Sequence, residues 1–180
     1  MMHSVRCIIM AGGQGNRFGS PTKFLQRVCG EIIIVRLLKQ LRAICSHVLL
    51  VLSKHTLSEL KSLCSNYEID CIELCGENYV KDLAIILDAY IKLPALVLAA
   101  DIVARESKVI AKFVEEALSE PAEVVTAVTS RNGGAEPIGL SLFKAPTGSW
   151  RNIVLPPNLI TDIDEVKDLK QAEKVCSNNA

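Results

Sequence analysis

The sequence predicts an α/β fold, a single domain whose mostly parallel sheet carries helices on both faces. Short apolar runs without polar alternation, such as residues 5–11 and 95–100, are typical of strands buried on both faces. Segments with helical spacing of apolar residues alternate with these runs along the chain. The length of 180 residues suits one core, so we expect residues 1–180 to form one domain.

Each element is predicted from its own residues. Strands are expected at residues 5–11, 47–52, 69–74, 95–100, 123–129 and 138–143. Helices are expected at residues 31–43, 56–65, 79–92, 107–119 and 164–176. Thr56 is the expected N-cap of the second helix, with Glu59 as its capping-box partner, and Asp164 is that of the last helix.

Composition excludes several classes of function. The twenty basic and twenty acidic residues cancel, so no net charge favours nucleic acid or an anionic membrane as a partner. No apolar run approaches the ~20 residues that span a bilayer, and the N-terminal run shows no cleavage signal. We therefore expect a cytoplasmic protein without a membrane span.

The seven cysteines are numerous for this length, but their number is odd and their spacing is irregular. Cys71 and Cys75 are the only close pair, and without a second pair or nearby histidines they are a weak zinc signal. We expect reduced thiols, mostly buried as small apolar groups, with a single stabilising disulfide as the alternative.

The segment 11–23, AGGQGNRFGSPTK, begins with the last residue of the first predicted strand, and residues 12–23 are expected to be a loop. Its glycines allow backbone N–H groups to approach a phosphate closely. The dinucleotide fingerprint fails because Phe18 stands at its third glycine, and no Gly-Lys-Ser/Thr completes a P-loop. A phosphate-binding loop with two cations, Arg17 and Lys23, remains; the alternative is a solvated surface loop.

Two cations suit nucleotidyl transfer at an α-phosphorus. Negative charge grows on the equatorial oxygens and on the departing pyrophosphate, so positive groups there act mainly on the transition state. Arg17 can bind phosphate through two N–H groups, whereas Lys23 acts as a point charge. An acceptor phosphate is already ionised at neutral pH and needs no general base. Accordingly, His3, His47 and His55 lie outside every motif.

The loop resembles the signature of the MobA-like nucleotidyltransferases, A-G-G-x-(G/S/A)-x-R-(M/F)-G followed by a lysine, within the glycosyltransferase-A-type fold. Residues 98–101, LAAD, resemble the central strand that ends in a metal-binding aspartate in that family. Residues 162–169 resemble its late (N/D)-I-(N/D)-T-x-x-D-L segment, with Glu165 where threonine is common. The resemblance implies catalytic roles for Arg17, Lys23 and Asp101.

The same resemblance implies a Mg²⁺ cofactor and a homodimer. A carboxylate facing a triphosphate needs a divalent cation between them, so Asp101 is expected to bind the metal. Its alternative role is a helix cap or a turn residue. Asp162 either completes the metal site or only organises the last loop. The apolar residues 32–35 and 153–159 suggest exposed surface that a second subunit would cover.

Within that family, three segments resemble the archaeal enzymes that transfer GMP from GTP to adenosylcobinamide phosphate. They are residues 76–83, 137–140 and 159–164. The resemblance implies GTP as donor and a phosphorylated small molecule as acceptor. It gives this nucleotide-binding set: Ala11, Gly12, Gly13, Gly15, Arg17, Lys23, Gly76, Asp82, Gly139 and Asp162.

Asp162 could accept the N–H groups of guanine or bind Mg²⁺. The alternatives are a molybdopterin guanylyl- or cytidylyltransferase and a nucleotide-binding module without activity.

Overall fold

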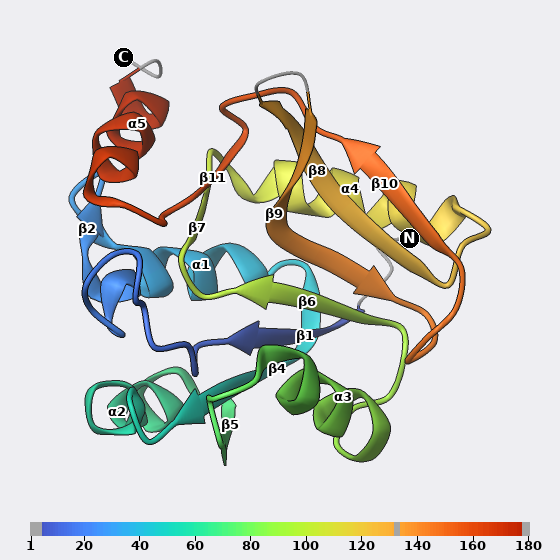
Figure 1. The fold of residues 1–180 in the computed structure, drawn as a ribbon, viewed down its shortest axis with the longest axis horizontal. Helices are drawn as coiled ribbons and strands as arrows, with labels where there is room; N and C mark the ends of the chain where they lie inside the picture. Colours follow the sequence, from blue (N-terminus) through green and yellow to red (C-terminus); the bar gives the residue numbers. More distant parts are fainter. Residues whose placement is uncertain (1–4, 132–133, 178–180) are drawn as a thin grey trace.

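The computed structural model describes residues 5–131 and 134–177 and confirms the predicted fold class. Seven strands form one sheet in the order β10-β8-β9-β6-β1-β4-β5 (Figure 1). They are β1 (Val5–Met10), β4 (Cys45–Ser53), β5 (Asp70–Leu74), β6 (Ala95–Ala99), β8 (Val124–Arg131), β9 (Gly134–Phe143) and β10 (Trp150–Val154). Only β9 runs antiparallel to its neighbours in this sheet.

Helices cover both faces of the sheet, as predicted. They are α1 (Ile33–Leu41), α2 (Leu57–Tyr67), α3 (Tyr79–Ala89), α4 (Ser107–Ser119), α5 (Val166–Ser177) and the 3₁₀ turn η1 (Lys23–Leu25). The largest core cluster packs α1, α2 and α4 against one face, with Ile34, Leu60 and Phe113 all buried. On the other face, Leu83 and Ile86 of α3 pack against the sheet. No helix of the described residues is long and apolar enough to cross a bilayer.

A third cluster positions the end of the chain. Ile163 and Ala172, from the last segment, pack with Val28, Ile33 and Val103. Two small antiparallel ribbons belong to this region: β2 (Arg27–Val28) with β3 (Glu31–Ile32), and β7 (Ile102–Ala104) with β11 (Ile160–Asp162). The second ribbon brings the acidic segment after β11 beside the carboxyl end of β6.

Some short strands were not predicted. The strand β10 lies at the sheet edge and pairs with β8, and only Ile153 of its five residues is buried. Such a strand shows neither an apolar run nor regular alternation, so period-based reading misses it. β7 and β11 have only three residues each, too few to show a period.

Both predicted caps need correction. Thr56 does occupy the N-cap position, but it makes no capping bond; its Oγ1 accepts from the Ser53 N–H at 3.2 Å instead. The last helix begins at Val166, and Asp164 does not cap it. The Asp168 carboxylate accepts from the N–H groups of Asp164 and Glu165, at 3.0 and 2.7 Å. Asp164 is thereby free to face the cations described below.

The two apolar runs differ in exposure. Ile33 packs toward α5 and Ile34 packs into the main core, because α1 has packed neighbours on two sides. In the second run Ile153 and Leu155 are buried, but Val154 between them is 64% exposed. The homodimer stays a prediction.

The expectation of reduced thiols is wrong for the described cysteines that pair. Cys7 is bonded to Cys45 and joins β1 to β4, with 5.8 Å between the Cα atoms. A bond between Cys64 and Cys71 joins α2 to β5. Cys29 is also disulfide-bonded, and Cys75 is free and exposed. The pairs are brought together by strand and helix packing, which cysteine spacing along the chain does not reveal. The side chain of Cys176 and all of His3 lie outside the described residues.

Candidate active site

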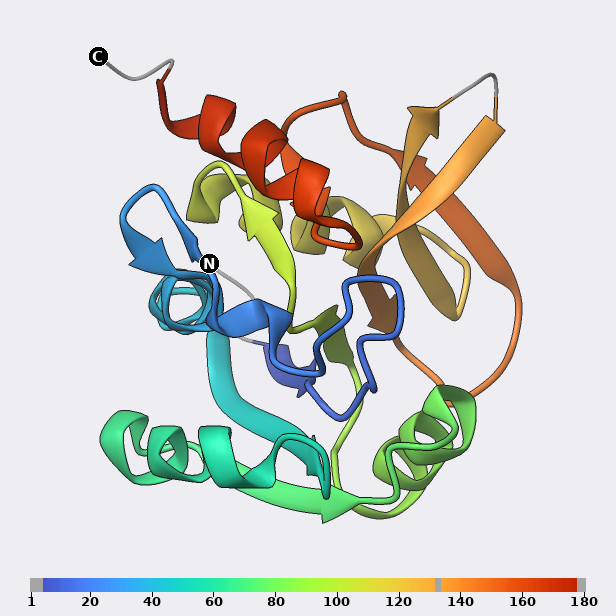
Figure 2. The ribbon, with the colours of Figure 1, turned by 60° about the vertical axis from the view of Figure 1, so that its left-hand side comes forward.

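A cleft of 630 Å³ lies at the carboxyl ends of the parallel strands, where ligands of such sheets bind. In Figure 2 the loop after β1 (blue) lies in the middle of this edge, between α5 (red) and α3 (green). Every residue predicted for the site lines the cleft: Ala11, Gly12, Gly13, Gly15, Arg17, Lys23, Gly76, Asp82, Asp101, Gly139 and Asp162. Segments far apart in sequence therefore meet here.

The glycine loop makes a tight turn at Gly15. This residue has a φ of +64°, and a Cβ on it would lie 1.8 Å from the Ser20 carbonyl oxygen. Its own carbonyl accepts from the N–H groups of Phe18 and Gly19, at 3.1 and 2.9 Å. Only glycine fits this backbone. The turn places Arg17 at its tip, where its side chain is 74% exposed.

Lys23 is the most enclosed cation of the site. It opens the turn η1, which Phe24 anchors in the main core with 3% of its surface exposed. The ammonium group forms an ion pair with Asp101, and both side chains are 14% exposed. A second carboxylate, that of Asp164, lies 3.3 Å from the same Nζ. Partial burial makes these charges interact more strongly than they would in bulk water.

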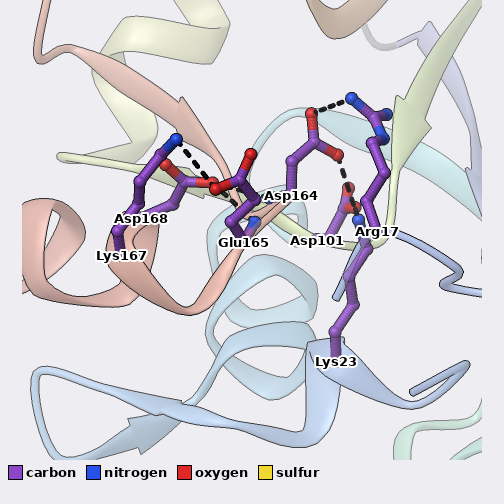
Figure 3. Close-up of polar contacts among 7 residues, drawn as sticks. All are labelled: Arg17, Lys23, Asp101, Asp164, Glu165, Lys167 and Asp168. Atoms are coloured by element: carbon purple, nitrogen blue, oxygen red, sulfur yellow. Dashed lines mark hydrogen bonds and ion pairs between the residues drawn. The ribbon is translucent and has the colours of Figure 1, made fainter. Parts of the chain in front are cut away.

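Asp164 joins both predicted cations. Its Oδ2 lies 2.7 Å from Nη1 of Arg17, while its Oδ1 faces Lys23. In Figure 3, Arg17, Lys23 and Asp101 lie on one side of Asp164, and the Glu165–Lys167 pair lies on the other. Sequence reasoning missed this residue because the start of a helix beside it explained an aspartate equally well.

Asp82 shapes the backbone of the cleft. Its side chain is 5% exposed, and its Oδ2 accepts from the Gly76 N–H at 2.8 Å. The N-cap of α3 is Asn78, whose Oδ1 accepts from the Lys81 N–H at 3.0 Å. Gly76 has a φ of +72° and packs so closely on Gly12 that a Cβ would lie 2.6 Å from its carbonyl oxygen.

The opposite side of the cleft is formed by β9 and α3. Gly139 has a φ of +67°, and a Cβ on it would lie 2.9 Å from that of Ala99, so glycine permits close approach of β9 to β6. Tyr79 is 55% exposed and lines the cleft. The pKa of its phenol is raised, first by desolvation and second by the negative charge of Asp101.

Asp162 of β11 pairs with Ile102 of β7, and Ile102 directly follows Asp101 in the sequence. The Ile163 N–H donates to the Asp101 carbonyl oxygen at 3.1 Å, which holds the two acidic segments together. Asp162 lines the cleft and is half-buried. The two predicted roles of Asp162, binding the metal or binding the base, both stay predictions.

Comparison with known proteins identifies a relative by sequence and several solved structures with a similar fold. The chain is 26% identical over 186 residues to adenosylcobinamide-phosphate guanylyltransferase of Methanocaldococcus jannaschii, covering 92% of this chain and 94% of that protein. Its fold is similar to that of CTP:phosphocholine cytidylyltransferase from Streptococcus pneumoniae, with a TM-score of 0.71, 13% identity, and 96% and 99% of the two chains covered.

The fold is also similar to that of inositol-1-phosphate CTP transferase from T. maritima, with a TM-score of 0.72 and 11% identity, covering 98% and 97% of the two chains. Identities this low show a shared fold and nothing finer. The sequence model of the MobA-like NTP transferase domain matches residues 7–175, nearly the whole chain. The protein, with its glycine loop and cation–carboxylate cluster at the carboxyl edge of the sheet, therefore belongs to the family of MobA-like NTP transferases and is a nucleotidyltransferase.

Proposed function

We propose that this enzyme transfers GMP from GTP to adenosylcobinamide phosphate with release of pyrophosphate. The observation that carries nucleotidyl transfer is the cluster of Arg17, Lys23, Asp101 and Asp164 at one side of a glycine-lined cleft. The guanylyltransferase of Methanocaldococcus jannaschii, similar over most of the chain, supports the choice of donor and acceptor.

In the proposed reaction an oxygen of the acceptor phosphate attacks the α-phosphorus of GTP. The bond from that phosphorus to the bridging oxygen breaks, and its electrons leave with pyrophosphate. Arg17 and Lys23 act on the charge that grows during this exchange. In the structure, the Lys23 ammonium contacts Asp101 and Asp164. We expect its ammonium group to turn toward the phosphates when GTP enters the cleft.

Carboxylate oxygens fit the predicted Mg²⁺ cofactor. The carboxylates of Asp101 and Asp164 both contact the Lys23 ammonium, so both lie close enough to serve one cation. This geometry favours Asp164 over Asp162 as the partner of Asp101 in the metal site. The described residues form no group of three metal donors, so phosphate oxygens and water would complete the coordination. The ion would neutralise phosphate charge, as Mg²⁺ does in phosphoryl transfer.

With Asp164 assigned to the metal site, we assign base selection to Asp162. Its carboxylate would accept the N1–H and N2–H₂ groups of guanine, whereas adenine presents an acceptor at N1. A site built on such hydrogen bonds rejects the wrong base strongly, because its buried polar groups are left unpaired.

The test is pyrophosphate release from GTP, CTP, ATP and UTP, each with cobinamide phosphate and with molybdopterin. We expect activity with GTP and cobinamide phosphate and little with the other combinations. Preference for CTP or for molybdopterin would overturn the specific assignment and leave nucleotidyl transfer in place. No pyrophosphate with any combination would favour a binding module.

The homodimer is part of the same proposal and follows from the family resemblance. We expect light scattering at micromolar concentration to give about twice the chain mass of 19.6 kDa. A monomer under these conditions would contradict it.

A further inference from the structure

Ser53 lies fully buried at the carboxyl end of β4, outside every motif noted in the sequence. Its hydroxyl group donates to the Gly12 carbonyl oxygen at 2.8 Å. The Ser53 Oγ itself accepts from the His55 N–H at 3.2 Å. The side chain thus links the end of β4 to the first glycine of the loop.

The Gly12 carbonyl belongs to the peptide unit that it shares with Gly13. Because this unit is planar and trans, its C=O and N–H groups point in opposite directions. With the carbonyl turned toward Ser53, the Gly13 N–H is directed away from β4. Gly13 lines the cleft, and nothing lies within 4 Å of where its Cβ would be. Among the described residues, none accepts a hydrogen bond from the Gly13 N–H, so this group is open to a ligand in the cleft.

Two successive glycines make this peptide unit easy to rotate, because no Cβ opposes the change of φ and ψ. The Ala11 N–H donates to the Val51 carbonyl at 2.9 Å, and this bond fixes Ala11, the residue before Gly12. Within the described part of the chain, the Ser53 hydroxyl is the only hydrogen-bond partner of the Gly12 carbonyl. One side chain thus decides which way the peptide unit points.

Gly76 closes this contact from a third segment. A Cβ on Gly76 would lie 2.6 Å from the Gly12 oxygen and 2.7 Å from Ser53 Oγ. The Asp82 carboxylate holds the Gly76 N–H in turn. Because Ser53 has no exposed surface, water cannot easily replace its hydroxyl if the side chain is shortened.

We propose that Ser53 is a positioning residue that orients the Gly12–Gly13 peptide unit, so that the Gly13 N–H donates to the bound nucleotide. The inference rests on the proposed function, since it requires an NTP in the cleft. Ser53 acts through backbone and touches no reacting atom. Its loss should therefore weaken nucleotide binding more than it slows the chemical step.

The test compares Ser53→Ala and Ser53→Cys with Ser46→Ala. A cysteine nearly preserves the volume but donates only weakly, so it separates loss of the hydrogen bond from loss of packing. Ser46 is a matched control, because its hydroxyl donates to the Val5 carbonyl at 3.2 Å between the same two strands, at their other end. Calorimetry would measure GTP affinity, and pyrophosphate release would measure kcat and KM.

We expect both Ser53 variants to bind GTP about tenfold more weakly, with kcat within about threefold of wild type. Ser46→Ala should stay within about twofold in both quantities. Unchanged GTP affinity in both Ser53 variants, or equal harm from Ser46→Ala, would overturn the inference while wild-type turnover upholds the proposed function. A folded wild type that binds no GTP would instead overturn the proposed function, and the inference with it.

Discussion

The two sides of the cleft differ in how they are built. One side carries charges: Lys23 and Asp101 are each 14% exposed and form an ion pair. Around Gly12 and Gly76 the backbone is instead ordered by single side chains: the Ser53 hydroxyl donates to the Gly12 carbonyl, and the buried Asp82 carboxylate accepts from the Gly76 N–H. The cluster of Lys23, Asp101 and Asp164 therefore lies where we propose that phosphates and a metal bind, whereas backbone groups of Gly12 and Gly76 line the neighbouring part of the cleft.

An exposed ion pair at the rim of the cleft shows why the burial of Lys23 and Asp101 matters. Lys54 and Glu77 lie 3.0 Å apart at the rim, with side chains 60% and 58% exposed. Exposed pairs of this kind contribute little, because water and salt screen them. We therefore assign a role in the proposed reaction to the enclosed pair of Lys23 and Asp101 and not to the exposed pair of Lys54 and Glu77.

The largest effect is expected at the centre of the charged side. Asp101→Asn should lower turnover by on the order of 100-fold or more, because a charged ligand of the proposed metal site is lost. Mg²⁺-dependent pyrophosphate release would measure it, and thermal unfolding would check that the fold is kept. Asp88→Asn, on the exposed side of α3, is the control. Near-normal rates in Asp101→Asn would exclude this residue from the site.

The two loop cations should differ in size of effect. Lys23→Ala should lower kcat/KM by about 100-fold, because it removes one preorganised cation and leaves two carboxylates facing each other. Arg17→Ala should cost about tenfold, since its side chain is largely exposed. Steady-state kinetics with GTP would measure both. Normal kinetics in both variants would mean that the loop has only a structural role.

Asp162 and Asp164, two residues apart in the acidic segment, are expected to differ in what their loss does to turnover. Asp164→Ala should slow all nucleotides alike, because Asp164 faces the Lys23 ammonium together with Asp101. Asp162→Ala should instead relax base selection by about tenfold while keeping turnover with GTP. The ratio of kcat/KM for GTP to that for ATP would separate the two effects. The reverse pattern would assign the metal to Asp162.

The smallest effect is expected at the rim. The pKa of Glu77 is lowered, first by its hydrogen bond from Lys54 and next by its contact with Cys75. A lowered carboxyl pKa adds stability above the unfolded-state pKa, and this stability is lost as the pH falls through the folded-state value. Glu77→Gln should therefore lower the Tm at pH 7 by about 1 °C or less, and the difference should shrink as the pH falls through the folded-state pKa of Glu77. A large or pH-independent loss would show that the pair is not a weak surface contact.

Much of the fold was predictable because its signals are local. Buried parallel strands such as β1 and β6 are continuous apolar runs, and α3 and α4 begin at the predicted residues. The strands that were missed include the edge strand β10 and the three-residue strands β7 and β11, which pair with each other in one ribbon. Their pairing depends on partners distant in sequence, so no local period marks them.

Local sequence patterns were enough to predict the fold class and the glycine loop with its two cations, because strand ends and glycines are properties of short segments, and the family resemblance added Gly76, Asp82, Gly139 and Asp162 to the cleft. Tertiary structure decided that Asp164 faces Arg17 and Lys23 instead of capping α5. It also decided that Cys7 meets Cys45 and that Ser53 reaches Gly12. Each of these contacts joins residues at least 38 positions apart, and only the packing of strands and helices sets such distances.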